Sequence, residues 1–395
     1  MEKYISAAEV CALLGVSKAT VYSYVSRGKL RSIGAPGTRE RRYWLPDVQR
    51  LSDGDAKTPP TEQKAVETSI TLVTKFGPYY RGQSALKLAE TASLEAVAGI
   101  LWQANAAELF SARKMKAPAG YARVSKMLGG LGDAERAIAL FTLLESADPA
   151  SYDLTPAGMA KTGSQVLRWL FAIALDTEAA MESPLHLAMA KKLKLAPEEG
   201  DLIRRLFVIA ADNGLVPATI AVRSVASTGV TPWRAVATGL TVATGIHSRL
   251  RNHGEALRFV RQVIETANPR QMVIRRLRDG ERFPGFSSPP YPEGDPRGAA
   301  LFEAYARVYE GDVAVKRMRI AIHAIEELTG QKPSFELANI FLRIKLGMAE
   351  GNTPFILART CGWVAHAIEQ YRYGQIVAGA ALYRGSLPLE TALRQ

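Results

Sequence analysis

The residues best suited to chemistry lie in one stretch, Phe283 to Arg297, which reads FPGFSSPPYPEGDPR. Proline or glycine fills seven of its fifteen positions, so neither a helix nor a strand can run through it. Two hydroxyls, Ser287 and Ser288, precede the charged residues Asp295 and Arg297. Compact domains seldom carry such a loop without a binding task. The stretch therefore predicts a stiff, charged loop that holds a ligand.

The remainder of the chain from about Ser69 predicts the helices that would position this loop. Apolar residues recur there at a spacing of three and four, which is typical of amphipathic helices. We expect helices over residues 94–102, 137–144, 165–175, 203–211, 234–243, 255–266, 299–307, 313–328, 337–348 and 356–370. Only residues 69–74 have the composition of a strand. Because no strands alternate with these helices, this region is expected to be an all-α domain. It contains no phosphate-binding glycine loop, nucleophile elbow or His/Cys cluster.

The first fifty residues predict a separate DNA-binding module. Residues 5–14 favour a helix with Ser6 as its N-cap, and Gly15 ends it. Ser17 caps a second helix over 18–27. A helix, a short glycine turn and a capped second helix are typical of a helix-turn-helix. The residues expected to contact DNA from the second helix are Lys18, Thr20 and Tyr22.

Charge supports this interpretation. Residues 1–50 hold nine Lys/Arg against four acids, a net +5, while the whole chain carries +12. Residues 31–44 favour two short strands around a Gly/Pro turn, a wing whose Arg39, Arg41 and Arg42 could reach phosphate. A concentrated positive charge indicates a polyanion partner. We prefer DNA over a helix-turn-helix that only docks another protein.

Composition argues against a membrane protein, a secreted protein and a metal-binding protein. Apolar residues make up 47% of 395 residues, and no apolar run is long enough to span a bilayer. The start, MEKYI, lacks a secretory signal, and Cys11 and Cys361 have no metal-ligand spacing. We therefore expect a cytoplasmic protein with no membrane partner and no metal. We expect the DNA-binding domain over 1–52, followed by a polar linker over 53–68.

The amino-terminal module resembles the winged helix-turn-helix of MerR-type regulators and excisionase-like proteins. The resemblance rests on three segments: Leu14 to Tyr22 (LGVSKATVY), Gly28 to Leu30 and Arg42 to Val48 (RYWLPDV). It implies a basic wing that contacts DNA beside the second helix.

The rest of the chain resembles the citrate synthase family. The matching segments occur in the family's order: Tyr80 to Glu90, Ala211 to Leu215, Phe283 to Arg297 and Arg359 to Gln370. The resemblance covers roughly residues 70–390. It implies a homodimer with a large helical domain over 69–249 and 359–395 and a small helical domain over 250–358.

The resemblance also implies roles for single residues, and several depart from the family's pattern. Asn213 and Ser288 stand where the family has substrate-binding histidines, and the catalytic aspartate corresponds to Glu336. A third histidine position is Ser248, with His247 one place earlier, and Ala378 stands where the family has an arginine that crosses the dimer interface. Arg297 and Arg359 match arginines that bind the dicarboxylate substrate. The catalytic set expected here is Glu336, Ser288 and His247, and the binding set is Asn213, Arg297 and Arg359. An alternative for Glu336 is purely structural, since Ser334 would be an N-cap and Glu336 a first-turn acid.

These substitutions leave three hypotheses for the function. The preferred one is a catalytically impaired, dimeric pseudoenzyme that senses a dicarboxylate or an acyl-CoA and regulates DNA binding. The second is an active acyltransferase that condenses acetyl-CoA or another acyl-CoA with oxaloacetate or a related keto acid, with Glu336 as the base. The third is a silent partner of an active paralogue. In none of them is a cofactor permanently bound; coenzyme A enters as a thioester substrate or ligand.

Overall fold

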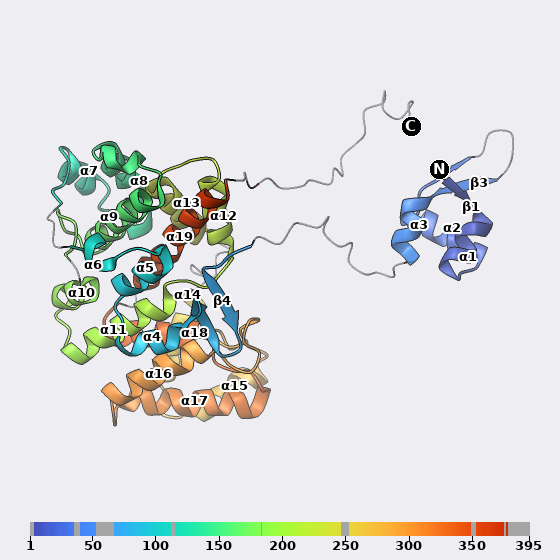
Figure 1. The fold of residues 1–395 in the computed structure, drawn as a ribbon. Coiled ribbons are helices and arrows are strands. Elements are labelled where there is room, and N and C mark those ends of the chain that lie inside the picture. The colour runs from blue at the N-terminus through green and yellow to red at the C-terminus, as the bar shows by residue number, and fades with distance from the viewer. Residues whose placement is uncertain are drawn as a thin grey trace. The chain divides into compact units, whose positions relative to one another are not determined.

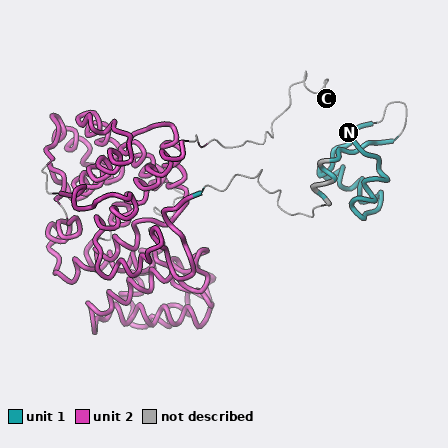
Figure 2. Tube along the Cα trace, in the orientation of Figure 1, with its two compact units in different colours: residues 1–67, 379–395 teal, residues 68–378 magenta. Residues whose placement is uncertain are grey.

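The chain forms two compact units, one built from residues 1–67 with 379–395 and one from residues 68–378 (Figure 2). The computed structural model describes residues 4–34, 40–52, 67–111, 115–182, 184–245, 253–348, 353–374 and 377. Each unit is described by itself below. In this part of the chain, no helix has the length and apolar character needed to cross a membrane.

The small unit combines three helices with a three-stranded antiparallel sheet of order β1-β3-β2 (Figure 1). Its elements are β1 (Tyr4–Ser6), α1 (Ala7–Leu14), α2 (Lys18–Ser26), β2 (Ser32–Gly34), β3 (Arg41–Trp44) and α3 (Leu45–Ser52). Ser6 and Ser17 cap α1 and α2 as predicted, and Gly15 ends α1 with a φ of 63°, a value that glycine tolerates best. The strand β1 was missed, because its pairing with β3 is a contact across forty residues.

The large unit is almost entirely helical, as predicted. Its helices are α4 (Ala85–Thr91), α5 (Leu94–Trp102), α6 (Ala106–Leu109), α7 (Tyr121–Met127), α8 (Asp133–Ser146), η1 (Pro149–Tyr152), α9 (Pro156–Ala174), α10 (Leu185–Leu193), α11 (Pro197–Ala210), α12 (Pro217–Ala226), α13 (Pro232–Ala243), α14 (His253–Glu265), α15 (Pro269–Arg278), α16 (Pro296–Val308), α17 (Val313–Thr329), α18 (Phe335–Lys345) and α19 (Thr353–Tyr373). The strand expected over 69–74 is β4 (Thr71–Thr74), which pairs with β5 (Gly77–Tyr80), and β5 pairs with β6 (Gln83–Ser84).

Helix α19 is the central element of this unit. It packs against α5, α9, α11, α12 and α13, and nearly every residue from Leu357 to Gln370 is buried. Close approach of the neighbouring helices requires glycine at two points. A Cβ on Gly163 would lie 2.5 Å from Val364, and one on Gly239 would lie 2.7 Å from the Trp363 ring.

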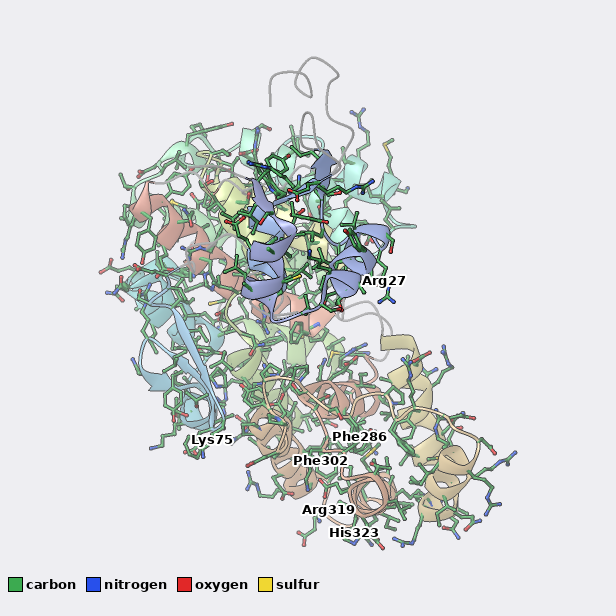
Figure 3. The ribbon with its side chains drawn as sticks, turned by 90° about the vertical axis from the view of Figure 1, so that its right-hand side faces the viewer. Arg27, Lys75, Phe286, Phe302, Arg319 and His323 are labelled. Atoms are coloured by element: carbon green, nitrogen blue, oxygen red, sulfur yellow. The ribbon has the colours of Figure 1, made fainter. Side chains whose placement is uncertain are left out.

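Helices α14 to α18 pack on one another, and α15, α16 and α17 occupy one end of the unit (Figure 1). The loop from Phe283 to Arg297 lies here, between α15 and α16, and Phe286 is buried among these helices (Figure 3). The separation of the body into a large and a small domain stays a prediction, because residues 68–378 form one unit.

Candidate functional site

The proline-rich loop is fastened to the segment that precedes α18. The Gly285 carbonyl accepts hydrogen bonds from the backbone N–H of Ser334 at 2.9 Å and from its hydroxyl at 2.8 Å. The Ser287 N–H donates to the Lys332 carbonyl at 2.8 Å. These bonds hold the loop that carries Ser288 against the segment that leads to Glu336.

Asp295 and Arg297 form the rigid end of the loop. The Asp295 carboxylate caps α16 and accepts two bonds from the Arg297 guanidinium, at 3.0 and 2.7 Å. The guanidinium lies between the rings of Tyr291 and Phe335, 5.1 and 5.0 Å from their centroids. Its remaining arm, Nη1, donates to Oδ1 of Asn213 at 2.7 Å. Two predicted binding residues, Asn213 and Arg297, are therefore in direct contact.

Arg359 is unusual because its charged side chain is buried and makes few hydrogen bonds with the described residues. It is 3% exposed on α19, and its guanidinium lies 4.8 Å from the centroid of Phe355. Within the described residues, neither Nε nor Nη1 of Arg359 has a hydrogen-bond partner. Burial lowers the pKa of Arg359, although nearby Asp212 and Tyr80 favour the charged form. A buried cation with two unused donors is costly unless an anion binds it.

Asp212 supplies the nearest negative charge. It is fully buried, and its Oδ2 lies 3.3 Å from Nε2 of His366. Burial alone would raise the pKa of Asp212, but His366 and Arg359 outweigh it and hold the pKa at about 2. Its Oδ2 also accepts the N–H of Gly214 at 2.9 Å, which shapes the turn that carries Asn213.

The other predicted site residues fall in different places. Ser288 is half-buried, and its carbonyl accepts the N–H of Tyr291 at 2.8 Å. Glu336 is half-buried in the first turn of α18, as the structural alternative expected. Ser334 does not cap that helix with its side chain, because its hydroxyl bonds to Gly285 instead. His247, Ser248 and Ala378 lie outside the described residues.

Two buried residues near the site were missed by the sequence-based prediction. Tyr80 donates its hydroxyl to the carbonyls at the end of α11, including Val208 at 3.0 Å, and burial raises its pKa. His366 contacts Asp212 as described. A usable signal existed for His366, because it follows Arg359 by seven residues and so lies on the same face of a helix.

The predicted DNA-contacting residues lie mostly on the surface of the small unit. Lys18, Arg41 and Arg42 are exposed, and Tyr22 is 55% exposed in the middle of α2. Thr20 is different: it is half-buried, and its hydroxyl lies 3.0 Å from that of Ser17 in the cap. The hydroxyl of Thr20 thus takes part in the cap of α2, and its contact with DNA stays a prediction. Arg39 lies outside the described residues.

Arg31, which the sequence analysis counted only toward the positive charge of the small unit, stabilises the strands of the wing. Arg31 forms a two-bond ion pair with the buried carboxylate of Asp47, at 2.8 and 3.0 Å, and its guanidinium carbon lies 5.4 Å from the centroid of the Trp44 ring.

Among the described residues, no group of three or more His, Cys, Asp or Glu could hold a metal ion.

Comparison with known proteins finds a matching family for each of the two units. A model of the citrate synthase C-terminal domain matches residues 61–379, and a helix-turn-helix domain model matches residues 4–45. The putative citrate synthase 2 of Mycobacterium tuberculosis is 31% identical over 209 residues, which cover 49% of this chain and 53% of that protein. The citrate synthase of Haloferax volcanii is 28% identical over 190 residues, or 46% and 50% of the two chains. The chain thus spans about half the length of the curated relatives it matches.

Solved structures show the same fold at low identity. Citrate synthase from Thermotoga maritima has a TM-score of 0.65 at 18% identity, over 84% of this chain and 96% of that one. The ternary complex of carboxymethyl coenzyme A and oxaloacetate with citrate synthase from Thermoplasma acidophilum has a TM-score of 0.65 at 16% identity, over 84% and 97%. The expected fold and the expected fusion are confirmed, whereas the likeness to MerR-type regulators stays a prediction.

Proposed function

Because the chain belongs to the citrate synthase family, we propose that its helical body binds a dicarboxylate and that its helix-turn-helix domain binds DNA in response. The protein would act as a homodimeric regulator with little or no condensing activity. The family supplies the scaffold, but fold does not fix function, so the argument rests on the site.

The observation that carries the proposal is the buried guanidinium of Arg359, whose Nε and Nη1 have no hydrogen-bond partner in the described part of the chain. Arg297 is already neutralised by Asp295, whereas two donors of Arg359 have no acceptor among the residues that the structure describes. A carboxylate can take two hydrogen bonds from one guanidinium. Asn213 keeps an amide N–H₂ group for a second carboxylate or a keto oxygen, because its Oδ1 is occupied by Arg297. This donor set suits a small dianion.

Turnover requires groups that this site has lost. Condensation needs a base to remove a proton from the acyl group and a donor to stabilise the enolate. The family's histidine positions hold Asn213 and Ser288, and neither side chain can carry a proton between steps. These replacements favour binding over catalysis.

The small unit supports the second half of the proposal. Its exposed Lys18, Arg41 and Arg42 and the exposed ring of Tyr22 fit the usual division between phosphate contacts and base contacts. Helix-turn-helix proteins commonly bind paired half-sites as dimers. A dimeric body would place two such units on one duplex.

An active enzyme is the second candidate, favoured by one observation. Glu336 retains a carboxylate in a segment that is hydrogen-bonded to the loop that carries Ser288. In that case Glu336 would be the base and Ser288 or Asn213 the enolate donor. A carboxylate displaced by the extra methylene could lose on the order of a hundredfold in rate.

Two measurements on the purified full chain separate these candidates. We expect titration calorimetry to detect oxaloacetate binding. We also expect no thiol release from acetyl-CoA or propionyl-CoA with oxaloacetate above the rate without protein. Release that is lost in Glu336→Gln would establish the enzyme instead, and the absence of any oxaloacetate binding would refute the proposed site.

A further inference from the structure

Four buried side chains form a continuous row that starts at Asp212, whose charge interacts with that of Arg359. We call this row, Asp212, His366, Arg223 and Glu369, the charge ladder. Asp212 Oδ2 lies 3.3 Å from His366 Nε2, His366 Nδ1 lies 3.3 Å from Arg223 Nη1, and the same Nη1 donates to Glu369 Oε2 at 2.6 Å. All four residues are at most 5% exposed.

The contacts fix which group donates at each step of the charge ladder, and Arg223 Nη1 donates to both of its neighbours, Glu369 and His366. A guanidinium can only donate, so Nδ1 of His366 accepts from Arg223. On the other side of the ring, Nε2 of His366 donates to Asp212, because a carboxylate can only accept. Each group is thus oriented by the one next to it.

One end of the charge ladder holds the chain where it enters the large unit. Glu369 Oε1 accepts both the N–H and the hydroxyl of Ser69, each at 2.8 Å. The Ser69 oxygen also accepts from Arg81 Nη1 at 3.0 Å. In the sequence, Ser69 directly follows the segment 53–68 that connects the body to the helix-turn-helix domain.

The other end is incompletely satisfied. In the described part of the chain, Oδ1 of Asp212 has no hydrogen-bond partner, and neither do Nε and Nη1 of Arg359. Asp212 is pressed against α19, because a Cβ on Gly362 would collide with its carboxylate. An anion bound by Arg359 would supply the acceptor that these two donors lack and would hold in place the guanidinium whose charge acts on Asp212.

We propose that a carboxylate bound at Arg359 tightens, through the charge ladder, the hold of Glu369 on Ser69, and so regulates how the segment leading to the DNA-binding domain is anchored. The proposal rests on the proposed function, since it needs an anion at Arg359. Ordering the loose end of a hydrogen-bonded series lowers the entropy cost of ordering its other end. All four ladder residues lie within the part of the chain that matches the citrate synthase model, and this chain adds a helix-turn-helix domain before Ser69.

Hydrogen exchange of the full chain with and without saturating oxaloacetate tests this directly. Amides in a peptide spanning residues 67–74 are expected to exchange at least threefold more slowly when oxaloacetate is bound. The matched control is the amide of Leu185, which a different buried carboxylate, Glu95, holds at 2.6 Å; its exchange should not change.

Two variants distinguish coupling through the charge ladder from a general loss of flexibility in the large unit when oxaloacetate binds. Glu369→Gln keeps an acceptor for Ser69 but removes the ion pair with Arg223, so it should bind oxaloacetate and lose the slowing at residues 67–74. Because that change lies in the core, Ser69→Ala is the second variant: it deletes the contacts of the hydroxyl with Glu369 and Arg81, leaves the backbone bond to Glu369, and should reduce the slowing. If calorimetry shows binding while wild-type exchange at 67–74 is unchanged, or if both variants respond fully, the coupling is refuted and the binding site stands. If oxaloacetate does not bind, both proposals fail.

Discussion

The two units use positive charge in opposite ways. In the small unit Lys18, Arg41 and Arg42 are exposed to water, whereas in the large unit Arg297 and Arg359 are buried. Exposed cations act through long-range attraction that salt screens. Buried cations act at short range on one bound group and are screened little. The difference separates a surface suited to a polyanion from a site suited to one small anion.

The cores differ as much as the charges. Five fully buried apolar residues hold the small unit together: Val10, Val21, Leu30, Tyr43 and Val48. The large unit has one extensive core that runs through all its long helices. Small domains have little stability to lose, so the DNA-binding unit should be the more fragile of the two.

Leu30→Ala should have the largest effect, and it tests whether the small unit folds independently of the large unit. Emptying the Leu30 site costs about 3 kcal/mol, which is a large share of the stability of a domain of some fifty residues. We expect loss of duplex binding with unchanged oxaloacetate binding. Leu206→Ala, at an equally buried site in the body, is the matched control and should leave the small unit folded. Equal damage to both activities by either variant would show that the units do not fold separately.

Arg359→Met tests the buried side of the comparison. The methionine keeps apolar volume but removes the only buried cation of the site for which no acceptor was found among the described residues. Oxaloacetate affinity should fall by roughly a hundredfold, measured by calorimetry. Arg204→Met removes another buried arginine, one whose donors are occupied by Asp201 and by backbone carbonyls. Equal losses in the two variants would mean that Arg359 has no special role.

The depressed pKa of Asp212 predicts how stability depends on pH. Its folded pKa of about 2 lies below the ordinary 3.8, so the ionised form is favoured by folding. The contribution is complete above about pH 4 and is lost as pH falls through 2. It amounts to about 2 kcal/mol. Denaturant unfolding at pH 5 and pH 2.5 should therefore show a smaller acid loss in Asp212→Asn than in wild type; parallel losses would refute the assignment.

Arg41→Ala should have the smallest effect and tests the exposed side. Removing one phosphate contact should weaken duplex binding several-fold and reduce the slope of log affinity against log salt by about 1. Arg319, on α17 of the body (Figure 3), is also exposed, and Arg319→Ala should leave the slope unchanged. A reduced slope in Arg319→Ala would mean that the body also contacts DNA.

Local patterns predicted most of this molecule. The caps at Ser6 and Ser17, the helical body and the stiff loop before Arg297 all depend on residues close in the sequence. The order of family motifs also predicted that Asn213, Arg297 and Arg359 share a site, and the structure joins Asn213 to Arg297 directly.

What the sequence could not supply were contacts across long separations. The bond between Ser69 and Glu369 spans 300 residues, and no periodicity predicts such a pair. The contact of the Thr20 hydroxyl with Ser17 was also out of reach, because it depends on the cap geometry of α2. The redirection of Ser334 to Gly285 likewise depends on how two distant loops meet.

The most direct test of the account is the affinity of the full chain for a duplex from its own upstream region, measured by fluorescence anisotropy with and without oxaloacetate. If the buried site governs the exposed one, saturating oxaloacetate should change the Kd at least fivefold, within the usual range of allosteric coupling, and Arg359→Met should abolish the change. An identical Kd in both conditions, with oxaloacetate shown to be bound, would contradict the account.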